Sequence, residues 1–65
     1  MNKDILQGNW TQFKGKAQKQ WGKLTDDELD EMEGRHEELN GALQKHYGYS
    51  KEEADKAIDD FLNAA

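Results

Sequence analysis

The sequence predicts an all-α protein, a small bundle of four short helices, and three observations support this prediction. The 65 residues contain no proline and no valine, and only two isoleucines and two threonines, whereas strands favour β-branched residues. Apolar residues recur at helical spacing along the chain. Two Thr/Ser-x-x-Glu patterns, typical of helix starts, begin at Thr25 and Ser50. The length allows one domain, over residues 1–65.

The six glycines reveal a repeat, because they form two triplets that are separated by 26 residues. The triplets are Gly8, Gly15 and Gly22, and then Gly34, Gly41 and Gly48. Over the 17 positions from 6 to 22, five are identical to the residue 26 positions later. We infer a duplicated helical hairpin with halves at about 5–33 and 34–63, joined at Gly34.

The first half predicts helices over residues 5–21 and 26–33. One apolar stripe runs along the first of these, through Leu6, Trp10, Phe13, Ala17 and Trp21. Gly22 is expected to end that helix in a left-handed conformation. Thr25 then caps the second helix, with Glu28 reaching back to form a capping box.

The second half predicts helices over residues 35–47 and 51–63. Leu29, Met32, His36, Leu39, Leu43 and Tyr47 form one stripe, and Ala54, Ala57, Ile58, Phe61 and Leu62 form another. Because the stripe keeps its phase across Gly34, a single helix over 26–47 is the alternative, but we favour a break or kink at Gly34. Gly48 is expected to end the third helix and Ser50 to cap the fourth, as Gly22 and Thr25 are expected to do in the first half.

Three glycines have no evident role in stability. Gly8 and Gly15 lie away from the apolar stripe of their predicted helix, where each costs about 1 kcal/mol relative to alanine. Gly41 occupies the position equivalent to Gly15 in the second half. We therefore expect any reason for these glycines to be functional.

The composition argues against catalysis, bound metals and membranes. No cysteine is present, and the two histidines lack the spacing of a zinc site. The acidic run from Asp26 to Glu33 suits a solvated helix start, and Ser50 is better explained as a cap than as a nucleophile. We predict no catalytic, cofactor-binding or metal-binding residues and hence no enzyme. No stretch approaches a membrane span or a signal peptide, so we expect a cytoplasmic protein with no membrane contact.

The two histidines admit structural explanations and one functional alternative. His36 lies on the apolar stripe, where we expect a partly buried ring with its polar edge at the boundary, and a pH sensor is the alternative. His46 precedes a helix end, where a cation is favoured.

The charges are unevenly distributed along the chain. Residues 5–25 contain no acid, and their lysines form a possible interaction surface: Lys14, Lys16, Lys19 and Lys23. Nucleic acid is disfavoured as a partner because the whole chain carries a net charge of -5. The simplest account pairs the basic first helix with the acidic second one, although contacts between copies could use the same asymmetry. We expect a monomer or weak self-association.

Four segments resemble the CsbD-like family of small bacterial stress-response proteins: Gly8-Asn-Trp-Thr-Gln-Phe-Lys-Gly-Lys16, Trp21-Gly-Lys-Leu-Thr-Asp-Asp-Glu-Leu29, Glu33-Gly34 and Tyr47-Gly-Tyr49. The resemblance extends from Asn2 to about Phe61. It implies a cytoplasmic bacterial protein, abundant under stress, with two helical hairpins packed roughly orthogonally. It brings no catalytic residues with it.

The function that we favour from the sequence is a non-enzymatic stress-response protein that acts as a hydrophilin-like protectant. A mean hydropathy of -1.22 and a charged fraction of 35% are extreme for a globular domain. The alternative is a small interaction module that binds a protein or nucleic acid through the lysine-rich first helix.

Overall fold

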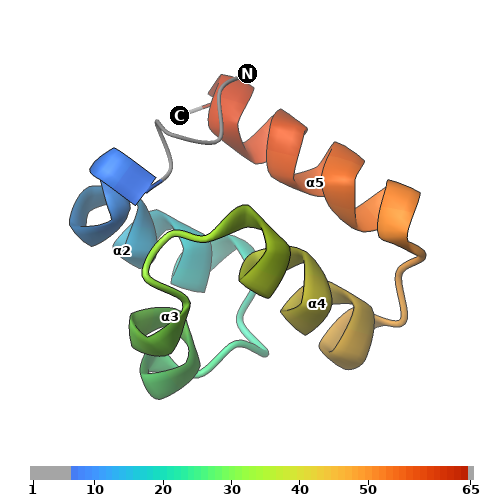
Figure 1. The fold of residues 1–65 in the computed structure, drawn as a ribbon, viewed down its shortest axis with the longest axis horizontal. Helices are drawn as coiled ribbons and strands as arrows, with labels where there is room; N and C mark the ends of the chain where they lie inside the picture. Colours follow the sequence, from blue (N-terminus) through green and yellow to red (C-terminus); the bar gives the residue numbers. More distant parts are fainter. Residues whose placement is uncertain (1–6, 65) are drawn as a thin grey trace.

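The computed structural model describes residues 7–64, and within them it confirms the all-α class (Figure 1). Four helices are formed and no strand is present in this part of the chain: α2 (Trp10–Gln20), α3 (Asp26–Met32), α4 (His36–Tyr47) and α5 (Lys51–Ala64). These bounds agree with the prediction to within one residue, except at the start of the first helix.

The first predicted helix is interrupted at Asn9. Gln7 and Gly8 are helical, but Asn9 lies in a turn with φ -124° and ψ 26°, and its carbonyl accepts the N–H groups of Gln12 and Phe13 at 3.0 Å. The turn at Asn9 therefore begins a new helix at Trp10. The predicted contribution of Leu6 to the apolar stripe lies outside the described residues.

The helices pack in sequence as α2 on α3, α3 on α4, and α4 on α5. Helices α4 and α5 form the more extensive pair and run side by side in opposite directions (Figure 1). The four-helix bundle is thereby confirmed, whereas the roughly orthogonal inclination of the two hairpins stays a prediction.

Most residues of the predicted stripes lie in the core, while Phe13, Tyr47 and Ala57 are partly buried against it. Its buried side chains are Trp10, Ala17, Trp21, Leu24, Leu29, Met32, Leu39, Leu43, Ala54, Ile58, Phe61 and Leu62. The indole N–H of Trp10 donates to the carbonyl of Leu29 at 2.7 Å and so ties α2 to α3 inside the core. At the other end of α2, Trp21 packs on Phe61 with 4.9 Å between ring centroids. Leu24, which no stripe predicted, is 1% exposed.

Both capping boxes are confirmed. Thr25 Oγ1 accepts the N–H of Glu28 at 3.1 Å, and Glu28 Oε1 accepts the N–H of Thr25 at 3.3 Å. Ser50 and Glu53 form the same reciprocal pair, at 3.1 and 2.8 Å. Each pair satisfies two backbone donors that a helix start leaves without an intrahelical partner.

The break between α3 and α4 is also confirmed, so the alternative of one helix over 26–47 is wrong. Glu33 and Gly34 both adopt left-handed backbone conformations, with φ of 53° and 76°. Glu33 is the only described residue other than glycine with positive φ. Two consecutive left-handed residues reverse the chain, and they place α4 against the helix that precedes it.

The prediction for Gly48 is confirmed and the matching prediction for Gly22 is wrong. Gly48 ends α4 with φ 69°, and its N–H donates to the carbonyl of Gln44, whereas Gly22 is not among the glycines with positive φ. Trp21 ends α2 with φ -125° and ψ 82°, and its N–H donates to the carbonyl of Ala17. The connection from Gly22 to the cap residue Thr25 is one residue longer than that from Gly48 to Ser50. The additional length lets Leu24 turn into the core.

The solvent-facing position of the three unexplained glycines is confirmed. Gly8, Gly15 and Gly41 are exposed, and a Cβ atom added to any of them would meet no atom within 4 Å. Gly15 lies within α2 and Gly41 within α4, so neither turns the chain nor allows close helix packing.

Candidate functional site

The four lysines predicted as an interaction surface lie in different surroundings. Lys14 lies between α2 and α3, where its ammonium group pairs with Asp30 and, at 3.1 Å, with Asp26. Its side chain is only 24% exposed. The two carboxylates, Asp30 first, raise the pKa of Lys14 above its ordinary value. The basic helix therefore packs on the acidic one through Lys14, which is the internal pairing that the charge distribution suggested.

The other three lysines are exposed. The Lys16 ammonium lies 5.8 Å from the ring centroid of Phe13. The Lys23 ammonium lies 5.1 Å from the ring centroid of Tyr47, whose hydroxyl accepts the Lys23 backbone N–H at 3.2 Å. These contacts place the ammonium groups of Lys16 and Lys23 over aromatic rings, in the geometry of cation–π interactions.

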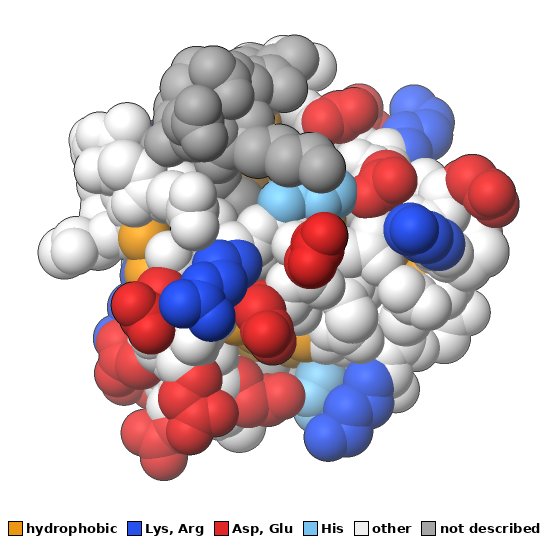
Figure 2. All heavy atoms as spheres, viewed as in Figure 1, with side chains coloured by type: hydrophobic (Ala, Val, Ile, Leu, Met, Phe, Trp, Pro, Cys, Tyr) orange, Lys and Arg blue, Asp and Glu red, His pale blue; other side chains and the backbone are white. Residues whose placement is uncertain are grey.

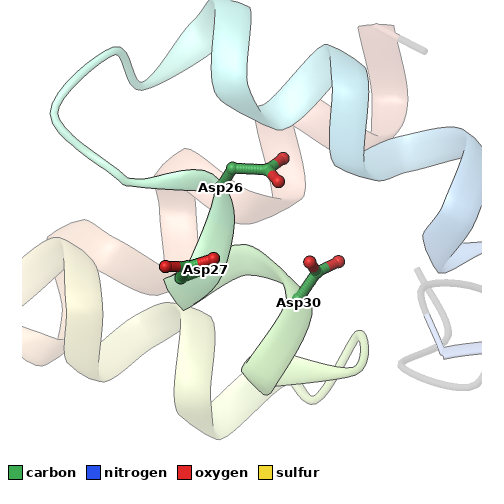
Figure 3. Close-up of side chains that lie close together, drawn as sticks. All are labelled: Asp26, Asp27 and Asp30. Carbon is green, nitrogen blue, oxygen red and sulfur yellow. The ribbon is translucent and has the colours of Figure 1, made fainter.

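Acidic side chains gather over α3 (Figure 2). Within the described residues, the cluster with the geometry to hold a cation consists of Asp26, Asp27 and Asp30, which all come from the first turns of α3 and are exposed (Figure 3). Two of these carboxylates already share the ammonium of Lys14. A metal ion would have to displace that lysine, so the cluster is better described as part of the helix packing.

Each histidine links α4 to a different neighbouring helix. At the start of α4, His36 Nε2 lies 3.4 Å from Asp55 Oδ1 of α5. Near its end, His46 Nε2 lies 2.9 Å from Glu28 Oε2 of α3. The His36 side chain is 15% exposed, in agreement with the expected partly buried ring. The pairing of His46 with a capping-box glutamate was not predicted, since the contact spans 18 residues.

These contacts keep Glu28 ionised. The hydrogen bond from His46, followed by the N–H of Thr25, lowers the pKa of the Glu28 carboxyl below its ordinary value of 4.5. At the second capping box, the N–H and hydroxyl of Ser50 lower the pKa of Glu53 in the same way. Both helix starts therefore carry a fixed negative charge where the macrodipole favours one.

Asn40 is a buried polar residue that sequence reasoning missed. Its side chain donates to Asp55 Oδ1 at 2.7 Å and to the carbonyl of Lys51 at 3.1 Å, and it accepts the Gln44 amide at 2.5 Å. Asn40 is 4% exposed and joins α4 to the start of α5. The sequence feature that could have predicted the burial of Asn40 is its place beside Leu39, on the buried side of the third predicted helix.

A concave feature with uneven charge lies between α3 and α4, and we call it the acidic groove. Four glutamates line it, Glu28 and Glu31 from α3 and Glu37 and Glu38 from α4. Its volume is about 300 Å³, at the lower end of the range for pockets that take small ligands or single side chains.

The rest of the lining of the acidic groove comes from three apolar or small residues and one lysine. Met32 is buried, Ala42 is half-buried, and Gly41 exposes bare backbone. Lys45 is the one cation among the lining residues. The groove therefore combines carboxylates with an apolar surface, and it has neither a nucleophile nor an acid–base pair set in an apolar pocket.

A family comparison places the chain among known sequences. The model of the CsbD-like family matches residues 4–56, which is most of the chain. The chain belongs to the CsbD-like family. The resemblance that the glycine, tryptophan and lysine segments suggested is thereby confirmed. CsbD-like proteins are generally associated with stress responses, and no specific molecular activity is assigned to them.

Several CsbD-like relatives match nearly the whole chain. The UPF0337 protein ECA0631 of Pectobacterium atrosepticum is 59% identical over 58 residues, which cover 89% of this chain and 84% of the relative. The UPF0337 protein YjbJ of Escherichia coli (strain K12) is 52% identical over 61 residues, covering 94% and 88%. The UPF0337 protein pc0632 of Protochlamydia amoebophila is 51% identical over 61 residues, covering 94% and 92%.

Among residues 7–64, no helix combines the length and the apolar character needed to cross a bilayer.

Proposed function

We propose that this CsbD-like protein is a non-enzymatic, cytoplasmic stress protein that acts as a hydrophilin-like protectant, as a monomer or with weak self-association. The observation that carries the proposal is the pair of exposed glycines inside helices, Gly15 in α2 and Gly41 in α4, with open space where a side chain would lie. Each lowers the helix stability by about 1 kcal/mol relative to alanine. Together they raise the unfolded population roughly 30-fold.

A loosely stable, highly charged chain suits a protectant for physical reasons. A core of this size supplies only about 3–5 kcal/mol of net stability, so a loss of 2 kcal/mol is a large fraction of the total. When water is withdrawn, a chain that opens easily offers many backbone and side-chain hydrogen-bonding groups to client proteins. Its charge of -5 keeps copies of the chain apart.

The test is to dry a desiccation-sensitive enzyme with this protein and to measure the activity recovered on rehydration. An equal mass of a neutral carrier protein is the reference, and the double variant Gly15→Ala/Gly41→Ala is the matched control. We expect the natural chain to preserve more activity than the carrier and more than the stabilised double variant. Equal recovery with the carrier would rule out the protectant function.

A second candidate, an interaction module that binds through the lysines of α2 and of the segment that follows it, is favoured by the exposed residues Lys16, Lys19 and Lys23. Because Lys14 is held by Asp26 and Asp30, the binding surface would consist of the other three lysines. Salt-dependent retention of DNA or RNA in a gel-shift assay, lost when these three become glutamine, would support it. The absence of any retention at low salt would dispose of the nucleic-acid form of the candidate.

A further inference from the structure

We propose that the acidic groove between α3 and α4 binds a lysine- or arginine-bearing segment of a basic protein partner. This proposal is independent of the protectant function, because it concerns a fixed surface of the folded chain rather than the ease with which the chain opens.

The first argument is the position of Gly41. It lies inside α4, it is exposed, and an added Cβ would meet no atom within 4 Å. The residue lines the acidic groove, so the missing side chain leaves the backbone open to whatever lies there. An alanine would improve the helix and disturb no contact within this chain. The bare backbone at this position brings no packing advantage within the chain, and it leaves room for a partner in the groove.

The second argument is the charge of the groove. Glu28 is held ionised by His46 and Thr25, which fix one carboxylate in place. Glu31, Glu37 and Glu38 also line the groove, and none of them makes an ion pair with a described residue. Four carboxylates against one lysine leave the groove strongly negative. The net charge of -5 adds a long-range field that attracts cationic partners.

The third argument is the mixture of chemistry in the groove, which suits the side chains of lysine and arginine. Both have a hydrocarbon stem that packs on apolar surface and a charged end that stays near water or carboxylates. Met32 and Ala42 provide the apolar surface, and a volume of about 300 Å³ accommodates such a stem. A bare metal ion would gain nothing from the apolar residues. A second copy of this chain would bring its own net charge of -5.

The experiment titrates the full ¹⁵N-labelled chain with a ten-residue peptide of alternating lysine and alanine, at low ionic strength, while amide NMR spectra are recorded. We expect the largest shifts at Gly41 and Ala42. Gly41→Ala should weaken binding about ten-fold while raising the melting temperature, so unfolding cannot explain the loss. Gly15→Ala is the matched control, since it makes the same change in an exposed helix outside the groove, and it should bind as the natural chain does.

A second pair of variants tests the charge. Glu37→Gln/Glu38→Gln removes two carboxylates from the groove, and Glu52→Gln/Asp59→Asn removes two exposed carboxylates from α5. We expect the first pair to weaken binding clearly more than the second. Equal losses would show attraction by net charge alone and would overturn the proposal, as would the absence of binding. Shifts at the groove that grow with protein concentration without peptide would assign it to a second copy and also overturn the proposal.

Discussion

Replacing the exposed helix-interior glycines with alanine should stabilise this protein. Gly15 and Gly41 lie within α2 and α4, both are exposed, and neither has positive φ. A methyl group at either position would meet no atom within 4 Å, so no steric cost offsets the gain. Gly15→Ala and Gly41→Ala therefore isolate the conformational entropy that glycine loses when it is fixed in a helix.

The expected gain is about 0.8–1 kcal/mol for each substitution, from the difference in helix propensity. The two sites lie on different helices and share no side-chain contact, so their effects should add to about 2 kcal/mol. In a domain of this size, 1 kcal/mol shifts the melting temperature by roughly 4–8 °C. The double variant should therefore melt roughly 8–16 °C higher than the natural chain.

Thermal melts followed by far-ultraviolet circular dichroism measure this shift, and Gly48→Ala is the matched control. Gly48 also has open space around it, but its φ is 69°. The same methyl group there should lower the free energy of unfolding by roughly 1–2 kcal/mol, because alanine is strained in the left-handed region. A fall in melting temperature for Gly15→Ala or Gly41→Ala, or a rise for Gly48→Ala, would refute the reasoning.

Three further predictions concern contacts that join the helices. Thr25→Ala should lower the free energy of unfolding by about 1 kcal/mol, because it removes the cap of α3. Thr11 is exposed within α2, so Thr11→Ala should not lower the free energy of unfolding. Urea melts of both variants check this. The pKa values of Glu28 and Glu53 are lowered in the folded state, so their stabilisation is present above about pH 4.5 and is lost as the pH falls through the folded-state pKa values. Melting temperatures measured from about pH 6 down to pH 3 should fall less steeply for Glu28→Gln/Glu53→Gln than for the natural chain. Asn40→Leu keeps the volume but leaves polar partners on α4 and α5 without their hydrogen bonds. We expect it to lower the free energy of unfolding by about 1–3 kcal/mol. An unchanged urea midpoint would contradict the bridging role of Asn40.

The features that could be predicted from the sequence are local ones. A capping box spans four residues, so Thr25 with Glu28 and Ser50 with Glu53 carry their whole signal in one short window. The apolar stripes are likewise a property of single helices, and they placed almost the entire core correctly. The break at Gly34 required a choice between two alternatives, because the stripe keeps its phase while the backbone reverses.

The features that could not be predicted depend on contacts between distant residues. Gly22 and Gly48 have equivalent sequence contexts, yet one additional residue in the first connection lets Leu24 enter the core and removes the need for a left-handed glycine. The pairing of His46 with Glu28 spans 18 residues, and that of Lys14 with Asp30 spans 16. The pairing of Lys14 with two carboxylates of α3 therefore depends on tertiary packing, which its own sequence neighbourhood does not encode.

The two proposals predict different effects of substituting the same pair of glycines, and this difference separates them. If the glycines serve to keep the fold loosely stable, Gly15→Ala and Gly41→Ala should impair protection during drying to the same extent, because the helix-propensity cost is the same at both sites. If Gly41 serves to open the α4 backbone to a partner, only Gly41→Ala should weaken the binding of the basic peptide, because Gly15 lies outside the acidic groove. Equal effects in the first assay and unequal effects in the second would mean that both glycines serve to keep the stability of the fold low, and that Gly41 alone also serves a binding surface in the second half.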